Sequence, residues 1–203
     1  MPGFTAIIDY GIGNLHSVSK ALDYIGIKNR ICGTAREIKA ADALILPGVG
    51  AFPDGMAALE KAGLVETIKS QSEIKPLLGI CLGMQLLFDK SHELVESAGL
   101  GLIPGTVGLI NTGLKLPQIG WNSLAIKKEN PLTRGLDDDS YVYFVHSYCA
   151  SPENPEHIGA TCDYGAEVCA ITMRGNLFGC QFHPEKSGDV GLQILKNFAE
   201  LYR

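Results

Sequence analysis

The feature that most constrains this chain is a glycine-flanked cysteine between a strand-like run and a helix-like run. Residues 76–80 are apolar and strand-like, Cys81 follows, and Leu82–Phe88 has helical character. This pattern is the sequence form of a nucleophile elbow, a tight turn whose flanking glycines leave a nucleophile at the tip. A thiol at a helix start also feels the positive end of the helix dipole, which favours the thiolate. The alternative, a buried core cysteine, fits the paired glycines less well, so Cys81 is interpreted as a nucleophile.

Strand-like and helix-like segments alternate through the first half of the chain. The predicted strands are residues 4–8 and 43–46. Helical spacing runs from Leu15 to Ile25, with Asn14 as N-cap and Gly26 as the stop, and a second helical stretch covers residues 54–72 with a break near Gly63. This alternation predicts a parallel α/β sheet.

The second half is richer in strands. We predict strands at residues 107–110, 123–126, 141–145, 167–173 and 177–182, the last two forming a hairpin across residues 174–176. A final helix begins near Gly188, and its apolar face includes Val190, Ile194, Phe198 and Leu201. The expected fold is therefore α/β: a single domain over residues 1–203, with a central, mostly parallel mixed sheet flanked by helices.

Composition excludes several classes of function. The net charge of −5 and the lack of a Lys/Arg-rich run argue against a nucleic-acid surface. No segment reaches the roughly 18 apolar residues of a membrane span, and the first residues lack the basic region of a signal peptide. None of the six cysteines forms a C-x-x-C pair or has a histidine at zinc-ligand spacing. We therefore expect no bound metal, no membrane association and a cytoplasmic location. The other five cysteines are expected to be small hydrophobic residues of the core.

A thiol nucleophile needs a base, and a base needs an orienting group. Among five histidines, His183 stands out because Pro184 biases it towards extended backbone. Side chains two residues apart in an extended chain point to the same side, so Glu185 is expected to fix the imidazole of His183. A solvated surface turn is the alternative, and the nearby presence of a cysteine nucleophile disfavours it.

Hydrolysis through a thiol also requires donors for the developing oxyanion. The N–H after the nucleophile, that of Leu82, supplies one. Residues 47–50 read Pro-Gly-Val-Gly just past a predicted strand, and glycine lets such a loop bring its backbone close. This loop is a candidate for the second donor, although a flexible strand-to-helix connection would look the same.

Taken together, these segments resemble the class I, triad-type glutamine amidotransferases. The superfamily is indicated by residues 79–85, Gly-Ile-Cys-Leu-Gly-Met-Gln, and by residues 181–185, Gln-Phe-His-Pro-Glu. Further segments resemble the glutaminase subunits of imidazole glycerol phosphate synthases, namely residues 9–15, 47–52, 120–122, 144–148 and 183–188. The match covers essentially the whole chain, and it implies the three-layer fold of that family with its nucleophile elbow at Cys81.

The resemblance implies a role for each matching residue. Cys81 would be the nucleophile, His183 the general base and acid, and Glu185 its orienting partner. The N–H groups of Val49 and Leu82 would form the oxyanion hole. The glutamine pocket would be lined by Gly48, Gly50, Gln85, His146, Ser147 and Tyr148. The implied reaction is hydrolysis of glutamine to glutamate and ammonia through a γ-glutamyl thioester, which requires no cofactor.

The same resemblance implies a partner. In the family a (β/α)8-barrel cyclase subunit receives the ammonia and makes imidazole glycerol phosphate and an aminoimidazole carboxamide ribotide in histidine biosynthesis. Asn14 and Trp121 match segments near the docking face. This chain departs from relatives that carry a histidine before Met-Gly-Trp-Asn, because it reads Gln118-Ile119-Gly120-Trp121-Asn122. The isoleucine preserves the apolar bulk of methionine. The missing histidine concerns how the chain docks to its partner and which acceptor enzyme that partner is.

Three alternatives remain open at this stage. A paralogous amidotransferase would supply ammonia to a different acceptor, and the triad cannot discriminate it. A binding subunit with a dead site is disfavoured by the intact Cys81, His183 and Glu185. A thiol hydrolase acting on other γ-glutamyl compounds would be recognised by failure to form a thioester with glutamine.

Overall fold

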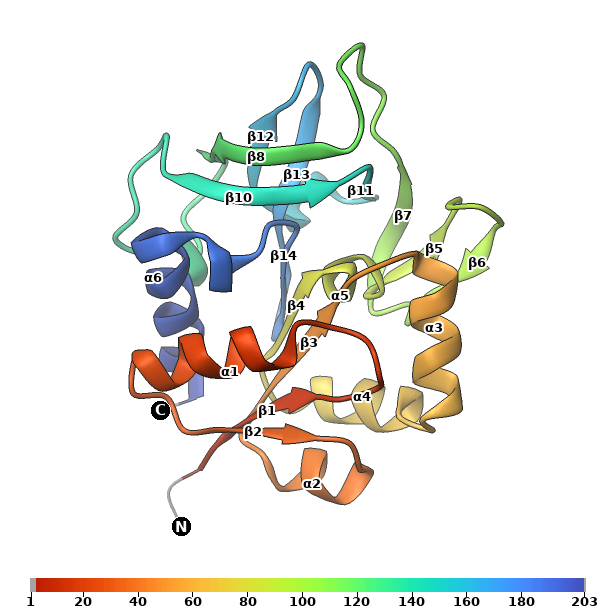
Figure 1. Cartoon of the computed structure of the whole chain (residues 1–203), viewed down its shortest axis with the longest axis vertical. Helices are drawn as coiled ribbons and strands as arrows, with labels where there is room; N and C mark the ends of the chain where they lie inside the picture. The colour runs from red at the N-terminus through yellow and green to blue at the C-terminus, as the bar shows by residue number, and fades with distance from the viewer. Residues whose placement is uncertain (1–2, 203) are drawn as a thin grey trace.

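A central sheet of eight strands forms the middle of the computed structural model, which describes residues 3–202 (Figure 1). Its spatial order is β2 (Asn29–Cys32), β1 (Thr5–Ile8), β3 (Ala43–Gly48), β4 (Leu77–Cys81), β14 (Leu177–Cys180), β13 (Glu167–Arg174), β12 (Ile158–Asp163) and β9 (Ala125–Ile126). Neighbours from β2 to β14 pair in parallel, and those from β14 to β9 pair antiparallel. The mostly parallel mixed sheet expected from the sequence is confirmed, with four parallel and three antiparallel pairings.

Helices cover both faces of this sheet because its central strands are apolar on both sides. Along β3 every residue is buried, and alternate side chains enter different clusters: Ile45 packs on one face, Leu44 and Leu46 on the other. The first face is covered by α1 (Leu15–Tyr24) and α6 (Gly188–Ala199). The second face is covered by α2 (Ala35–Ala40), α3 (Phe52–Lys61) and α4 (Val65–Ser72). The result is a three-layer α/β arrangement.

Two smaller sheets lie above and beside the one-turn helix α5 (Leu82–Gln85) in the view of Figure 1. One pairs β8 (Gln118–Ser123) with β10 (Tyr141–His146). The other has the order β11 (Tyr148–Pro152), β7 (Ile103–Leu109), β5 (Phe88–Ser91) and β6 (Ser97–Ala98). The remaining elements are 3₁₀ turns: η1 (Pro131–Thr133), η2 (Pro155–His157), η3 (Pro184–Lys186) and η4 (Glu200–Tyr202).

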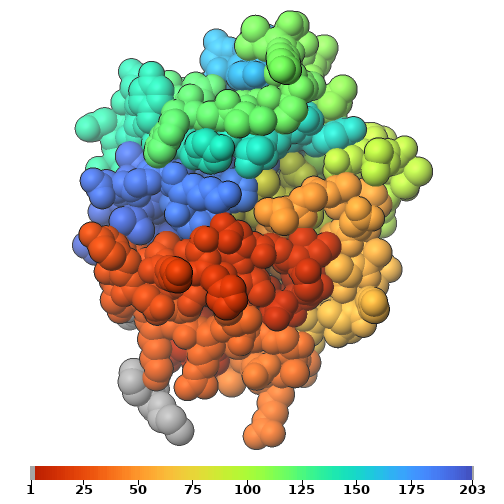
Figure 2. Space-filling view, in the orientation of Figure 1, coloured from red at the N-terminus to blue at the C-terminus, as the bar shows by residue number. Residues whose placement is uncertain are grey.

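Segments far apart in the sequence meet on one side of the molecule (Figure 2). The red α1 segment borders the blue α6 segment, and α6 in turn contacts β10 of the upper layer. The C-terminal part of the chain thus joins the N-terminal helix to the small β8–β10 sheet.

Several expected elements are confirmed with shifted bounds. The hairpin across residues 174–176 is present, since Arg174 pairs with Leu177. The break in the second helical stretch separates α3 from α4. Residue 14 is the N-cap position of α1, but the Asn14 side chain makes no capping bond. The final helix ends at Ala199, so Leu201 lies in η4.

Two expectations were wrong. The helix predicted over Leu82–Phe88 stops at Gln85, because the next residues turn at once into strand β5, which pairs with β7. The strand predicted over residues 123–126 is two strands in different sheets: β8 pairs with β10, whereas β9 pairs with β12. Strands β2, β5, β6, β11 and β12 and helix α2 were not predicted.

Candidate active site

The turn at Cys81 has the strained backbone of a nucleophile elbow. Cys81 is the last residue of β4 and adopts φ 55° and ψ −112°, a left-handed conformation that costs energy in a residue with a side chain. The flanking glycines are required for close packing. A Cβ on Gly83 would lie 1.8 Å from the carbonyl oxygen of Leu46, and one on Gly79 would lie 2.6 Å from that of Gly83. Cysteine itself therefore takes the strained conformation, while the glycines let α5 sit against β3 and β4.

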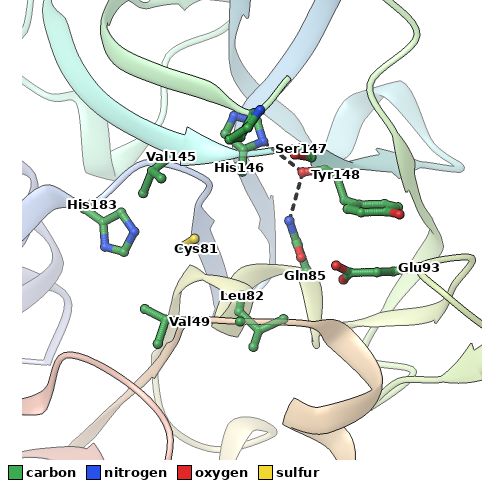
Figure 3. A pocket seen from close by; sticks show the side chains of 12 residues that line it. Val49, Cys81, Leu82, Gln85, Glu93, Val145, His146, Ser147, Tyr148 and His183 are labelled. Atoms are coloured by element: carbon green, nitrogen blue, oxygen red, sulfur yellow. Dashed lines mark hydrogen bonds between the residues drawn. The ribbon is translucent and has the colours of Figure 1, made fainter. Parts of the chain in front are cut away.

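His183 and Glu185 reach the same end of the sheet because β14 is the parallel neighbour of β4. His183 keeps the expected extended backbone, with φ −98° and ψ 97°. The extended geometry does not continue to Glu185, which lies in η3. The carboxylate nevertheless accepts from the imidazole, with 2.9 Å between His183 Nδ1 and Glu185 Oε1. Both side chains are buried, and the ring of His183 lies beside the sulfur of Cys81 (Figure 3).

This pairing sets the charge of His183. Burial lowers its pKa, but interactions with the Cys81 side chain and the Glu185 carboxylate outweigh burial and raise the pKa to about 9. Since Nδ1 donates to the carboxylate, Nε2 is the atom left for the thiol. Nε2 makes no hydrogen bond of standard geometry within residues 3–202, as is common before a substrate tightens a site. An imidazolium here would stabilise a thiolate at Cys81.

A cavity of about 300 Å³ opens in front of this pair (Figure 3). Most of its lining was expected from the sequence: Val49, Gly50, Cys81, Leu82, Gln85, His146, Ser147, Tyr148 and His183. Glu93, Pro117 and Val145 line it as well and were not predicted. Glu185 lies behind His183. A volume of this size is at the lower end of the range of small-molecule pockets.

Gly48 does not line the cavity. It pairs with Cys81 between β3 and β4. A Cβ at Gly48 would lie 2.7 Å from Tyr10 Oη and 2.9 Å from the Gly83 nitrogen, so glycine is needed there for space. Beyond it, Val49 is half-exposed at the cavity and Gly50 has a φ of +94°, which favours glycine.

Gln85 connects the wall of the cavity to Cys81 through a chain of contacts. Its Nε2 donates to the Tyr148 carbonyl at 2.9 Å and to Gln181 Oε1 at 3.0 Å. Gln181 Nε2 in turn lies 3.9 Å from Cys81 Sγ. A polar side chain buried this deeply requires such partners. The sequence gives Gln181 only as part of a motif, and its contact with the sulfur is a finding of the structure.

His146 also faces the site but differs from His183 in its chemistry. Its Nδ1 lies 2.8 Å from the Tyr148 carbonyl oxygen. Burial lowers the pKa of His146 to about 4; the bond to Tyr148 opposes this and the nearby His183 adds to it. His146 is therefore neutral at pH 7, with its proton on Nδ1.

Glu93 places a carboxylate at the end of the cavity away from His183 (Figure 3). Its Oε2 accepts from the backbone N–H of Phe52, the first residue of α3, at 2.8 Å. Glu93 is the acidic side chain that lines this cavity, among the residues described. It lies between β5 and β6, two strands that the sequence did not predict, so no pattern pointed to it.

The two residues matched to a docking face lie outside the cavity. Trp121 is 55% exposed and packs edge-on against Tyr143. Ile119 and Tyr141 are also exposed on this β8–β10 sheet. Trp121 is thus not a core residue. Asn14 is half-buried at the start of α1.

Comparison with known proteins decides the family. Residues 6–201 match the family model described as glutamine amidotransferase class-I. The chain belongs to the class I glutamine amidotransferases.

Close relatives within this family share a name. The "Imidazole glycerol phosphate synthase subunit HisH" of Caldanaerobacter subterraneus subsp. tengcongensis is 52% identical over 198 residues, covering 97% of this chain and 98% of that protein. The protein of the same name from Bacillus cereus is 52% identical over 194 residues, covering 95% and 92%.

Solved structures of low identity share the fold. "Structure of PurLQS from Thermotoga maritima" contains a chain with a TM-score of 0.81 and 19% identity, and each chain is covered completely. "Crystal structure of glutamine amidotransferase" has a TM-score of 0.79 and 19% identity, covering 98% of this chain and 99% of that one. The class I amidotransferase fold expected from the sequence is confirmed.

Within residues 3–202, no cluster of three or more His, Cys, Asp or Glu side chains is arranged to hold a metal ion. In the same range no helix has the length and apolarity needed to cross a membrane.

Proposed function

We propose that this chain is the glutaminase subunit of an imidazole glycerol phosphate synthase, acting in the cytoplasm in histidine biosynthesis. The observation that carries the chemistry is the buried His183–Glu185 pair beside the strained Cys81, at the mouth of a cavity of about 300 Å³. The subfamily rests on relatives of that name at 52% identity over nearly the whole chain.

Glutamine hydrolysis by the three residues Cys81, His183 and Glu185 would proceed in two stages. The Cys81 thiolate attacks the side-chain amide carbon of glutamine, forming a C–S bond and a tetrahedral oxyanion. The C–N bond then breaks as the His183 imidazolium protonates the leaving nitrogen, which departs as ammonia. Water, deprotonated by the now neutral His183, attacks the γ-glutamyl thioester and the C–S bond breaks. Glutamic acid leaves and loses its proton to solvent, and the Cys81 thiolate and the His183 imidazolium are restored. Glu185 holds the imidazole in the tautomer that keeps Nε2 toward sulfur.

The oxyanion is assigned to two backbone donors. The Leu82 N–H belongs to the first residue of α5, where helical N–H groups have no intrahelical acceptor. The Val49 N–H belongs to the loop between β3 and α3, in which the left-handed backbone of Gly50 allows sharp local changes of direction.

The remaining lining residues recognise glutamine as an amino acid. Ser147 and Tyr148 present backbone and hydroxyl groups along one wall, and Gln85 fixes the Tyr148 carbonyl. Glu93 lies at the far end from His183, where its carboxylate would pair with the α-ammonium group of the substrate. Gly50 leaves room for the substrate backbone.

A partner subunit explains the exposed apolar face. Ammonia released into water at neutral pH is protonated and loses its nucleophilicity. The exposed side chains of Ile119, Trp121 and Tyr141 form a surface rich in aromatic residues, of the kind enriched at protein interfaces. We assign this surface, with Asn14, to docking of a (β/α)8-barrel cyclase that consumes ammonia. The second candidate function is a paralogous subunit that serves a different acceptor enzyme.

Glutamate release from glutamine tests the proposal. The purified chain is assayed alone, with a barrel cyclase subunit, and with that subunit plus its nucleotide ligand. Stimulation in the full mixture supports the histidine-pathway subunit. A rate of glutamate release that the cyclase does not change would still support glutaminase activity, but would indicate a different acceptor enzyme.

Variants of exposed apolar residues then test the docking face. Trp121→Ala should reduce cyclase affinity by about 10-fold or more, as loss of an aromatic anchor does. Ile74→Ala is the matched control, because Ile74 is 69% exposed but precedes the opposite, amino-terminal end of β4. Equal affinity of both variants would remove Trp121 from the interface.

A further inference from the structure

Two buried side chains at one register position of the β8–β10 sheet each carry a polar atom without a partner. Gln118 and His146 are directly opposite in the antiparallel pair, so their Cβ atoms project to the same face about 5 Å apart. They are only 2% and 7% exposed. Within residues 3–202, neither Gln118 Oε1 nor His146 Nε2 has a hydrogen-bond partner. Native proteins pair nearly all such atoms, so this coincidence needs an explanation.

The unpartnered atom of His146 is an acceptor. A carbonyl oxygen can only accept, so the 2.8 Å contact with Tyr148 requires the proton on Nδ1. Burial keeps the ring neutral by lowering its pKa to about 4. Nε2 therefore presents a lone pair and requires a donor.

Gln118 can supply this donor by exchanging the two ends of its amide. As placed, Nε2 faces Cys162 Sγ at 3.8 Å, a weak contact, and Oε1 is unpaired. A half-turn of the amide swaps oxygen and nitrogen, which have nearly the same shape. Oxygen then accepts from the Cys162 thiol, and the nitrogen is free to donate.

We propose that Gln118 is a positioning residue whose side-chain amide donates to His146 Nε2 and holds the imidazole in the tautomer that donates to the Tyr148 carbonyl. This hydrogen bond satisfies His146 Nε2, and the same amide orientation pairs the Gln118 oxygen with the Cys162 thiol. It also leaves each of the two strands with its buried polar side chain paired across the sheet.

The bond would stand at the outer end of a chain of contacts that reaches the nucleophile. The Tyr148 carbonyl accepts from both His146 and Gln85, Gln85 donates to Gln181, and Gln181 lies against Cys81. The consequence for glutamine binding rests on the proposed function of the cavity. The hydrogen bond itself does not.

NMR of isotope-labelled imidazole nitrogens tests the bond directly, with His146 assigned through a His146→Gln variant. Gln118→Met keeps an unbranched side chain of similar length but removes the donor, so the Nε2 resonance should move to the position of an unbonded acceptor. Gln118→Glu places a carboxylate beside Nε2, and the pKa of His146 should rise. Ser123→Ala, on the same strand but away from His146, should change neither. A Nε2 resonance that is identical in wild type and Gln118→Met overturns the proposal.

Inactivation by a diazoketone analogue of glutamine tests the consequence. Gln118→Met should raise the half-saturating concentration about 10-fold and leave the maximal rate within about 2-fold, because binding is disturbed and the triad is not. Gln118→His retains an N–H donor and should restore much of the affinity. An unchanged half-saturating concentration in Gln118→Met contradicts the proposal.

Iodoacetamide separates this inference from the proposed function. It alkylates Cys81 without using the glutamine pocket, and its rate should be the same in wild type and Gln118→Met. A wild-type chain that reacts with iodoacetamide but resists the analogue at all concentrations would overturn the proposed function. The Nε2 resonance would still decide the hydrogen bond.

Discussion

His183 and His146 line the same cavity, yet they reach it from different sheets and in opposite protonation states. His183 follows β14 of the central sheet, and a carboxylate and a thiol raise its pKa to about 9. His146 ends β10 of a small sheet, and burial lowers its pKa to about 4 although its bond to the Tyr148 carbonyl opposes this. At neutral pH the imidazolium of His183 therefore has a proton to donate, whereas the neutral ring of His146 keeps its proton on Nδ1.

The difference follows from what each sheet provides. Parallel strands β4 and β14 end side by side, so Cys81 and His183 meet at one edge of the sheet. The small sheets instead supply neutral donors and acceptors, such as the Tyr148 carbonyl that accepts from both Gln85 and His146. We interpret the first wall as the site of bond making and breaking, and the second as the wall that binds and orients substrate.

Removing the Cys81 thiol is the strongest test of this division. Cys81→Ala should lower the rate of glutamine hydrolysis by at least about 10⁴-fold, since no other group can form the thioester. Glutamine binding, measured by calorimetry, and cyclase binding should persist. Cys149→Ala is the control, because Cys149 adjoins the binding wall and burial raises the pKa of its thiol to about 11. Retained hydrolysis in Cys81→Ala would remove the triad assignment.

The geometry of the elbow is the next largest effect. In Gly83→Ala the new methyl would lie 1.8 Å from the Leu46 carbonyl oxygen, and backbone cannot yield cheaply. We expect a loss of about 3 kcal/mol or more in the free energy of unfolding, measured by urea denaturation. Gly113→Ala meets no atom within 4 Å and should be nearly neutral. Equal stability of the two variants would contradict the tight packing of α5 on β3.

The carboxylate behind His183 has a smaller effect that depends on pH. The imidazolium must donate to the leaving nitrogen, so hydrolysis should fall as pH rises through about 9. Glu185→Gln removes a charge that stabilises the imidazolium. The rate should drop about 10²-fold and the basic limb should move to lower pH. The pH profile of kcat tests both.

Glu93→Gln is the matched control for this variant. It removes a carboxylate from the same cavity without touching His183, so it should raise KM for glutamine and leave the basic limb in place. If the limb moved in Glu93→Gln but not in Glu185→Gln, the roles of the two carboxylates would have to be exchanged.

The same comparison shows what the sequence could and could not predict. The residues at the edge of the central sheet could be predicted because their sequence signals are local: an apolar strand, a glycine-flanked cysteine, and a histidine before a proline. Even there, the reason for Gly83 was different from the expected one. Its small size matters because of Leu46, a residue far away in the sequence.

The binding wall depends on contacts that no local pattern encodes. Glu93 lies between two short strands that were not predicted, and its place in the cavity is fixed by a bond to the first residue of α3. A longer helix was predicted in place of the short α5 because the apolar segment after Gln85 fits either a helix or a strand. Only its pairing with β7 makes it a strand. Tertiary pairing overrides local preference at both places.

The smallest expected effect is on the pH dependence of the free energy of unfolding, to which the two histidines contribute with opposite signs. His146 resists protonation in the folded chain, whereas in the unfolded chain it titrates near pH 6.5. Unfolding therefore takes up a proton between pH 6.5 and about 4, and stability should fall as pH falls through that window. His183 behaves in the opposite way: its contribution is complete below pH 6.5 and is lost as pH rises towards about 9.

The two windows do not overlap, so one series of denaturation curves resolves both. Replacing His146 by glutamine should flatten the acid side by about 2 kcal/mol and leave the alkaline side unchanged. His183→Gln should flatten the alkaline side. Carboxylates that do not contact either histidine are common to all three proteins and cancel in the differences. If His146→Gln left the acid slope intact, His146 would already be charged in the folded chain, and the two histidines would not differ in protonation.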